Sequence, residues 1–577
     1  MLYLFNTYLI FMHLLTPNPK VYFSALLLLS VLSSCIQEQP KEKVSSEIKI
    51  SESAEPSSIN PFFIRDELGF YICSQIWQPL LAVDYQKEVL VGVLAEERPQ
   101  ISSSENWSME IKYKLRKDAK FSNGKQVKYS DVLFSLKANI SPLVNPFYSS
   151  YYEFIDSVSV DCADSSCFTI YSKDTYYLSE FSSGDYFIVS EDQFDPEHTL
   201  RSYSIAQLKN ASENKSDTTL INYAEEIQAI DFRDSTPTIG SAPYAVDSWM
   251  AGEKMKLTKV LNWWGENHRE ANSYFKANAE SFSFYFIEDA TTAINALENG
   301  DFHLMRAIPP KQFRRLEKDE RFSSQFDLKS VPRFAYQYLG FNLSKPLLSD
   351  IRVRKAIAYS VPTSEIIDNL YYGLASPCLS FQPQADESTA NATAKYDLNQ
   401  DSAKAYINAF RADHPNKELK LTYTYNAGND KRKAIGLILK ESLKDIGIEL
   451  EIETYEWTVY LEKLRGGELD LFLNGAVNSA ITPDLSNSFH SSAIQSGRNY
   501  FQYQDELSDQ LLDSIHDCLD AEKRDRLFSK LEKRIFEQLP MLPLIQPMET
   551  IAFSKQLQNA NAYRLRPNFW VAEISLE

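Results

Sequence analysis

The sequence predicts an α/β protein with more than one domain, and two observations support this prediction. Residues 419–475 carry strand and helix patterns in the order β-α-β-α-β, which requires a largely parallel sheet with helical crossovers. The chain has 577 residues. About 540 of them follow an apolar leader, too many for one hydrophobic core and enough for two or three domains.

The α/β pattern begins with a strand at 419–426, "LKLTYTYN". A helix is expected at 430–446, because apolar residues recur there at helical spacing and Gly447 follows as a stop. Residues 448–455 alternate apolar and mostly glutamate side chains, as in a strand with one buried face. The last two predicted elements are a second helix and an apolar strand, at 457–467 and 469–475.

The first half of the chain shows a second ordered region. Residues 109–116 alternate apolar and polar side chains and predict a strand. Asn123 and Gly124 suit a turn with positive φ, and Ser130 is the expected N-cap of the helix that follows. Residues 195–238 are polar without a strong period, which predicts a surface insertion.

The N-terminus carries an apolar run at 21–34 that follows Lys20 and is too short to span a bilayer. It has the parts of a secretory signal, so we expect residues 1–34 to be a signal peptide. The alternative is a buried core strand. The segment Leu32-Ser33-Ser34-Cys35 resembles the cleavage box of bacterial lipoproteins, which implies lipid on Cys35 and a polar tether at 35–47.

Charge and cysteine content limit the partners and the compartment. With 78 acidic and 59 basic residues, the net charge of −19 argues against nucleic acid and anionic lipid as partners. Cys162 and Cys167 flank four residues between two strand-like runs. A disulfide across this hairpin and two separate thiols both fit that spacing. With no second cysteine or histidine cluster nearby, we predict no metal site and no cofactor.

Seven segments follow one another in a distinctive order. The most specific is 113–139, where a strand ends in Leu-Arg, Asn-Gly-Lys follows, and Asp-Val and Phe-Ser lie on a helix. The other six are "EPSSINPF" (55–62), "QIWQPLL" (75–81), "TIGSAPYAVDSW" (238–249), "EDATTAINALENGDFHL" (288–304), "YLGFNLSKPLLSDIRVRKAIAYSV" (338–361) and "RDRLFSKLEKRIFEQLPMLPL" (524–544). Together they resemble the family 5 extracellular solute-binding proteins, the oligopeptide and dipeptide receptors of ABC importers.

This resemblance implies a two-lobed periplasmic-binding-protein fold, of the large class II type, with a ligand cleft between the lobes. The expected base lobe combines 48–80, 185–330 and 540–577, with a small inserted domain at 81–184 and a second lobe at 331–539. The implied function is capture of a peptide or another small polar solute for ABC permease subunits. The implied protein is a monomer of the cell envelope, on the outer side of the cytoplasmic membrane.

The resemblance also implies ligand-binding residues. Family members that bind peptides use an aspartate for the α-ammonium at the position where this chain has Ser479. Trp457 stands at a ligand-facing tryptophan or packs under its helix, and Arg65 meets an anionic group or is simply solvated. The remaining candidates lie at the end of an apolar strand, in the small domain or in the second lobe: Asn474, Asn478, Phe147, Tyr148 and Asn342.

Three other functions compete with solute import. An enzyme is disfavoured because the sequence has no H-E-x-x-H motif, no G-x-S-x-G motif, and seven histidines that are scattered singly. A ligand sensor or adhesion lipoprotein on the same fold has no distinguishing sequence feature. A receptor for a nickel chelate or haem also fits, provided that an organic chelator holds the metal.

Overall fold

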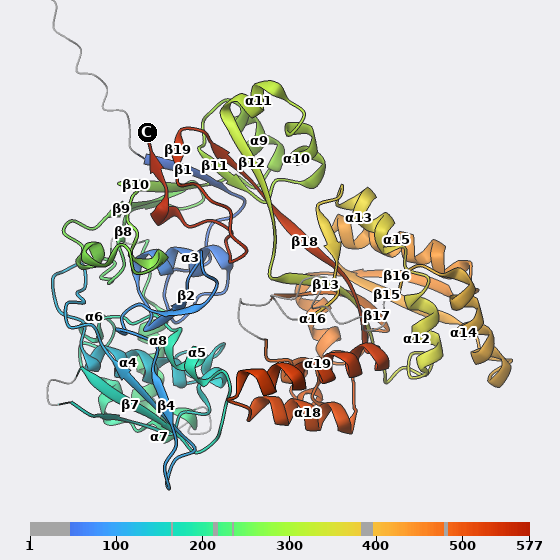
Figure 1. The fold of residues 1–577 in the computed structure, drawn as a ribbon, viewed down its shortest axis with the longest axis horizontal. Helices are drawn as coiled ribbons and strands as arrows, with labels where there is room; N and C mark the ends of the chain where they lie inside the picture. Colours follow the sequence, from blue (N-terminus) through green and yellow to red (C-terminus); the bar gives the residue numbers. More distant parts are fainter. Residues whose placement is uncertain (1–46, 163–165, 212–216, 234–235, 382–395, 478–482) are drawn as a thin grey trace, which may run out of the picture. The chain divides into compact units, whose positions relative to one another are not determined.

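The structure is a computed structural model that describes residues 47–162, 166–211, 217–233, 236–381, 396–477 and 483–577 (Figure 1). The predicted signal peptide, the lipidation site Cys35, most of the tether and the candidates Asn478 and Ser479 lie outside these ranges. Within them, no helix combines the length and the apolar character needed to cross a membrane.

One 12-stranded sheet runs through the described chain. Its main path is β16 (Glu449–Tyr455), β15 (Lys420–Asn426), β17 (Leu471–Val477), β13 (Ala335–Phe341), β18 (Met541–Ser554), β11 (Leu304–Arg306), β1 (Glu47–Glu52), β10 (Ser281–Phe286), β9 (Lys254–Lys259) and β8 (Tyr244–Met250). Two further strands, β12 (Phe326–Pro332) and β14 (Ala375–Pro377), pair with β18.

The long strand β18 lies in the middle of this strand order and joins two parts of the sheet, β16 to β13 on one side and β11 to β8 on the other (Figure 1). Its first part pairs with β13, from Met541 to Ile545, and its second part pairs with β12, from Met548 to Ser554. Only Arg333 and Phe334 separate β12 from β13. The chain therefore crosses between the two parts of the sheet twice, at β18 and at the β12–β13 connection.

The predicted β-α-β-α-β unit is confirmed. Between its strands lie α15 (Asp430–Lys444) and α16 (Trp457–Arg465), and β15 is parallel to both β16 and β17. Ile435, Leu439 and Leu443 form the buried face of α15, as their helical spacing predicts. In β16, Leu450 is buried while the glutamates beside it are exposed, because the strand has only one face on the core.

A separate antiparallel sheet lies within 81–184: β4 (Gln100–Ser102), β5 (Met109–Lys114), β7 (Cys167–Ser172) and β6 (Ser157–Val160). The strand predicted at 109–116 is present as β5, and Gly124 has φ +82° as the turn requires. A disulfide joins Cys162 and Cys167 at the β6–β7 hairpin. The structure thus selects the bonded alternative for these two cysteines.

Ser130 is not the N-cap that its position suggested. The helix, α4 (Tyr129–Ile140), has Lys128 as its N-cap. The carboxylate of Asp131, inside the first turn, accepts a hydrogen bond of 2.8 Å from the backbone N–H of Lys128. The backbone N–H of Asp131 in turn donates to the carbonyl oxygen of Lys128 at 3.0 Å, so the first turn closes on Lys128 without a capping hydroxyl.

The surface insertion predicted at 195–238 contains regular structure that its polar composition does not suggest. Helix α8 (Thr218–Gln228) lies there and buries Leu220, Tyr223, Ala224 and Ile227. The carboxylate of Asp217 caps it by accepting from the Leu220 N–H. The apolar spacing is helical, but a polar stretch before it dilutes the pattern over the whole segment.

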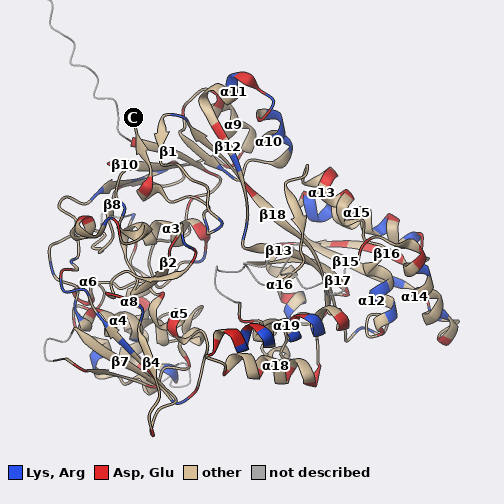
Figure 2. Cartoon of the chain, in the orientation of Figure 1, with Lys and Arg blue, Asp and Glu red and all other residues tan. Residues whose placement is uncertain are grey.

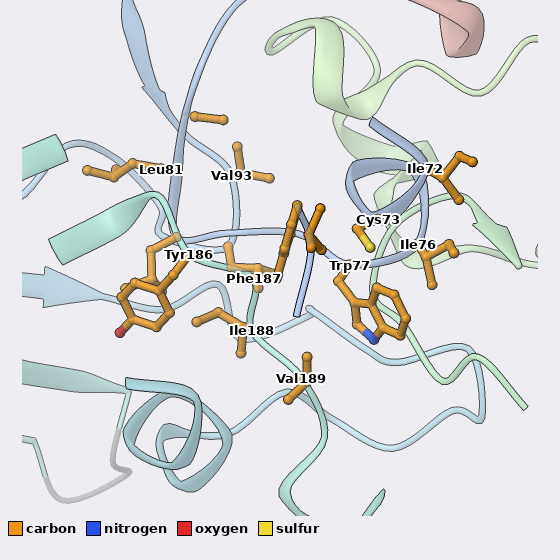
Figure 3. Packing of buried hydrophobic residues seen from close by; sticks show 14 of the residues in the cluster. Ile72, Cys73, Ile76, Trp77, Leu81, Val93, Tyr186, Phe187, Ile188 and Val189 are labelled. Atoms are coloured by element: carbon orange, nitrogen blue, oxygen red, sulfur yellow. The ribbon is translucent and has the colours of Figure 1, made fainter. Parts of the chain in front are cut away.

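The buried apolar residues form separate clusters. The largest combines β1, β10, α3 (Glu67–Ile76) and the 81–184 sheet, whereas another is built from β13, β15 and β17. Figure 3 shows side chains of the largest cluster, among them Ile72, Cys73 and Ile76 of α3 and Ile188 and Val189. The largest cluster continues from the expected base lobe into the expected small domain, and the boundaries at 81 and 184 stay a prediction.

The segment 238–249 depends on a close approach of two backbones. A Cβ on Gly240 would lie 1.7 Å from the carbonyl oxygen of Ile76, so only glycine fits there. Because of this approach, Ala242 can donate its N–H to the same carbonyl at 3.0 Å. The glycine of this segment thus fixes α3 against the start of β8.

The other elements complete the two parts of the chain. The shorter helices are α5 (Ser179–Gly184), α6 (Glu191–Phe194), α7 (Ile205–Lys209), α9 (Ala290–Glu298), α10 (Pro310–Leu316), α11 (Glu320–Gln325), α12 (Ile351–Ala358), α13 (Thr363–Leu370) and α17 (Ser486–Phe489). The longer ones are α14 (Gln400–Asp413), α18 (Glu506–His516) and α19 (Ala521–Gln538), and α19 carries both signs of charge (Figure 2). Two small antiparallel pairs remain, β2 (Leu81–Val83) with β3 (Leu90–Gly92) and β19 (Leu557–Gln558) with β20 (Ser575–Leu576).

Candidate functional site

A cavity of about 580 Å³ lies beside the β12–β13 connection. Residues from distant parts of the chain line it: Ile64, Arg65, Asp66, Glu67, Phe70, Tyr71, Ser74, Val83, Tyr85, Tyr148, Phe181, Asp185, Tyr274, Phe334, Val477, Leu565 and Arg566. Every one of the three expected domains contributes to this lining. A volume in this range is typical of sites that bind small organic ligands.

The cavity wall contains exposed apolar side chains. Phe70 is 48% exposed, Tyr148 is 42% exposed and Val477 is 55% exposed, and all three line the cavity. Large apolar side chains that gather at a concave surface usually mark a place where another molecule binds. This wall offers apolar area that a ligand would cover.

A second cavity of about 250 Å³ adjoins the first. The two share part of their lining: Ile64, Phe70, Tyr148, Phe181 and Asp185. The smaller one adds mainly aromatic walls, from Tyr151, Tyr152, Tyr186 and Phe187. It is therefore an aromatic recess that extends from the larger space.

Two candidates from the sequence, Arg65 and Tyr148, line the larger cavity, and a third, Phe147, lies next to them. The guanidinium of Arg65 lies over the ring of Phe147, 4.6 Å from its centroid. Among the described residues Arg65 has no ion pair, so its charge is held only by this contact with the ring. It is available to an anionic group in the cavity.

A cluster of charges stands at one side of the cavity. Glu67 lies 2.5 Å from Arg306 and 2.9 Å from Arg566, and Arg306 also bonds Glu52 at 2.7 Å. Burial opposes the ionisation of Glu67, but the neighbouring arginines outweigh it and hold the pKa of its carboxyl below the usual value. These groups neutralise one another and leave little charge for a ligand.

The same cluster reaches the connections between the two parts of the sheet. Arg333, which lies between β12 and β13, is 3.4 Å from Glu549 of β18 and 3.8 Å from Glu67. Glu549 also accepts the backbone N–H of Ala307 at 2.8 Å. The cavity and both chain crossings therefore share one network of ion pairs.

Asp185 is a further candidate, which the sequence patterns do not single out. It follows α5 and lines both cavities, and burial raises the pKa of its carboxyl to about 8. Its side chain has no hydrogen bond or ion pair with any other residue that the structure describes. The signal in the sequence is a single acid between Gly184 and the apolar run 186–189.

Two other candidates stand apart from both cavity linings. Trp457 is 50% exposed and stacks on Tyr460, with ring centroids 5.9 Å apart. The amide oxygen of Asn474 accepts from the backbone N–H of Gly475 at 2.9 Å and from Arg432 at 3.3 Å. Neither side chain lines the 580 Å³ or the 250 Å³ cavity.

Asn342 does not belong to the candidate set. It is 1% exposed, and its amide nitrogen donates to the carbonyl oxygens of Gly467 and Leu469, both at 2.8 Å. Its amide oxygen accepts from the N–H and hydroxyl of Ser344. The side chain joins two loops and has no group left for a ligand.

Tyr177, in the expected small domain at 81–184, also contacts residues of the expected second lobe at 331–539. The hydroxyl of Tyr177 donates to the carbonyl oxygen of Pro483 at 3.0 Å, and its N–H donates to that of His516 at 3.0 Å. The guanidinium of Arg524 lies 5.2 Å from the centroid of the Tyr177 ring. We call Tyr177, Pro483, His516 and Arg524 the Tyr177 contact.

Comparisons with known proteins identify the chain's relatives. The model of the bacterial extracellular solute-binding proteins, family 5 (middle region), matches residues 89–498. The oligopeptide-binding protein AppA of Bacillus subtilis is 23% identical over 552 residues, 93% of this chain and 92% of that protein. The periplasmic oligopeptide-binding protein OppA of Haemophilus influenzae is 22% identical over 546 residues, 91% of this chain and 93% of that protein.

A solved structure agrees with this relationship at the level of fold. The putative peptide-binding protein AppA of Clostridium difficile superimposes with a TM-score of 0.72 at 20% identity, over 92% of this chain and all (100%) of that chain. The sheet with its crossing strands is thus the two-lobed fold that the seven sequence segments predict. With the family match covering most of its length, this chain belongs to the family 5 bacterial extracellular solute-binding proteins.

Proposed function

We propose that the protein binds a peptide, or a related polar organic solute, in the 580 Å³ cavity and delivers it to the permease subunits of an ABC transporter. The observation that carries this proposal is the lining: exposed aromatic side chains together with Arg65 and Asp185, which have no ion pair among the described residues. A zwitterionic ligand would supply the opposite charge to each. No bond of the ligand is broken in this role.

The expected location follows from residues at the N-terminus and from one disulfide. The leader and the lipoprotein-like box favour a lipid anchor on Cys35, and the Cys162–Cys167 bond suits an oxidising compartment outside the cytoplasm. A single chain tethered in this way, acting as a monomer, would present its ligand to the permease at the membrane surface.

Native mass spectrometry of the purified protein tests the proposal. We expect either a carried-over peptide, released with unchanged mass on denaturation, or saturable binding from a mixture of short peptides. Failure to bind any peptide, together with capture of a nickel chelate or haem, would assign the cavity to that competing ligand class. Release of a chemically altered compound would show that the protein is an enzyme.

Substitution of Tyr148 tests whether this cavity is the binding site. Tyr148→Ala removes a ring that lines both cavities, and we expect the Kd for a bound peptide to rise about fivefold to tenfold, the usual value of one aromatic contact. Isothermal titration calorimetry measures this change. Leu261→Ala is the matched control, because Leu261 is 87% exposed and lines neither cavity. Equal affinities for the two variants would place the ligand elsewhere.

The Tyr177 contact predicts a larger effect on affinity without touching the ligand. The expected small domain at 81–184 and the expected second lobe at 331–539 both line the cavity. A contact that holds these two regions together therefore favours the ligand-bound arrangement. Tyr177→Ala removes a hydrogen bond and a cation–π contact, together about 2 kcal/mol, so we expect the Kd to rise up to about 30-fold.

Tyr177→Phe provides the graded comparison. It loses only the hydroxyl bond to Pro483 and is expected to weaken binding about fivefold. Stopped-flow dissociation rates locate the effect, which should lie mainly in faster release. If both variants bind and release a peptide as the parent does, the Tyr177 contact plays no part in holding the ligand.

A further inference from the structure

The smaller cavity combines an acidic group with aromatic walls. Asp185 lies at the junction of the two cavities, where it lines both. Around it stand the rings of Tyr148, Tyr152 and Tyr186, together with Phe70. Ring faces carry partial negative charge and attract cations, and aromatic recesses of this kind are a known way to bind ammonium groups.

The carboxyl of Asp185 lacks a positive partner in the described part of the chain. Neither arginine that shares its cavity forms an ion pair with Asp185: Arg65 lies over the ring of Phe147, and Arg566 is paired with Glu67 at 2.9 Å. Burial raises the pKa of Asp185 to about 8, so the empty site holds a proton at neutral pH. An ionised carboxylate in such a place requires a counter-charge, and a bound cation would provide it.

We propose that the smaller cavity is a subsite for a cationic group of the ligand, an ammonium or a guanidinium, with Asp185 as its counter-ion and the tyrosine rings as its walls. This inference rests on the proposed function, since the ligand would enter through the larger cavity. It narrows the ligand class to solutes with a positive charge that fits the recess.

Binding at this subsite should depend on pH, because a cation selects the ionised form of Asp185. The other charged groups that line the two cavities are Arg65, Asp66, Glu67 and Arg566. The neighbouring tyrosines stay neutral near neutral pH, because burial raises the pKa of Tyr148, Tyr152, Tyr186 and Tyr274. A change in binding between about pH 6 and pH 9 would therefore report the proton on Asp185.

The experiment uses cadaverine, a diamine, and its neutral analogue 1,5-pentanediol, titrated calorimetrically into the full-length protein. We expect cadaverine to bind and pentanediol not to bind. The Kd for cadaverine should fall about tenfold from pH 6 to pH 7 and by about another tenfold to pH 9, where Asp185 is almost fully ionised. Asp185→Asn should abolish this pH dependence and weaken binding at pH 9 at least tenfold.

A control variant and a measurement of folding stability show whether a loss of binding comes from the subsite itself. Asp192→Asn is the control, because Asp192 is an exposed acid paired with Lys125 at 2.7 Å, away from both cavities. Asp185→Asn should fold at least as well as the parent at pH 8. The parent loses stability as the pH rises from about 4 to 8, since the unfolded chain releases the Asp185 proton earlier than the folded chain does. The asparagine variant has no such loss.

A pair of peptides that differ only in one lysine or norleucine extends the test to the proposed function. If these peptides and cadaverine bind the parent and Asp185→Asn equally at all pH values, the cation subsite is refuted while peptide binding stands. Cadaverine binding that needs Asp185, with no peptide bound, would refute the peptide ligand and keep the subsite. If neither cadaverine nor the lysine peptide binds, the inference falls.

Discussion

Replacing Arg306 with methionine is expected to lower the free energy of unfolding by about 3–5 kcal/mol, the usual cost of leaving buried charges without their partner. Arg306 is largely buried and holds Glu52 and Glu67 at 2.7 and 2.5 Å. Methionine has a similar length and no charge, so it leaves two carboxylates without their closest cation. Chemical denaturation at neutral pH measures the loss.

The pH dependence of this loss checks its cause. Burial already raises the pKa of Glu52 in the parent, whereas the arginines lower that of Glu67, and loss of Arg306 should raise the pKa of both carboxyls further in the native state. The variant is then least stable, relative to the parent, at neutral and higher pH, and the difference should shrink as the pH falls below about 5. A loss that is independent of pH would mean that packing, and not charge, is responsible.

A solvated pair provides the control for Arg306. Arg526 lies 3.8 Å from Glu522 on α19, and both side chains are mostly exposed. Arg526→Met should change the free energy of unfolding by less than about 0.5 kcal/mol, because water screens such pairs. A cost for Arg306→Met as small as this would contradict the assigned role of the buried cluster.

Arg354→Met is expected to have the next largest effect, a loss of about 3–4 kcal/mol in the free energy of unfolding. The buried guanidinium of Arg354 donates to four carbonyl oxygens, those of Leu348, Ser349, Gln538 and Leu539, at 2.5–3.0 Å. Burial lowers the pKa of Arg354 to about 10. Removing the guanidinium leaves these carbonyls without a donor, and each buried unpaired group costs about 1–3 kcal/mol.

The Arg354→Lys variant separates charge from geometry. Lysine keeps the charge but donates from a single nitrogen. It cannot reach the carbonyls at 348–349 and those at 538–539 together, so it should recover only part of the lost stability. Lys355→Met, at the adjacent and partly exposed position, is the control and should cost less than about 1 kcal/mol. Denaturant midpoints that coincide for the parent and Arg354→Met would show that the carbonyls find other donors.

Hydrophobic periodicity is sufficient to predict a helix or a strand when the pattern of that element is strong. In the β-α-β-α-β unit at 420–477, Leu450 of β16 is buried between exposed glutamates, and Leu471, Phe472 and Leu473 of β17 are all buried, as the alternating and the apolar runs predict. Helix α8 escaped prediction because its short apolar face stands next to a polar stretch. Residue type favours Ser130 as a cap, whereas Lys128 is the N-cap and its backbone N–H donates to Asp131 in the first turn.

For the candidate site, residue types indicated some members and hid others. Arg65, Phe147 and Tyr148 follow from their positions in family-like segments, and the structure brings them together. Asn342 lies in an equally family-like segment, yet its amide is fully used in joining two loops. Sequence position cannot separate a ligand contact from a buried structural hydrogen bond, because both favour the same polar residue.

The sequence by itself determined the family, the α/β class and the β-α-β-α-β unit, because these depend on local periodicity and on the order of segments along the chain. Only the tertiary structure decided which side chains share a cavity and which charges remain without a partner. Asp185 shows the reason: its pKa and its availability depend on residues from Ile64 to Arg566 that the fold brings around it. Burial and pairing are properties of that neighbourhood, and distance along the chain does not encode them.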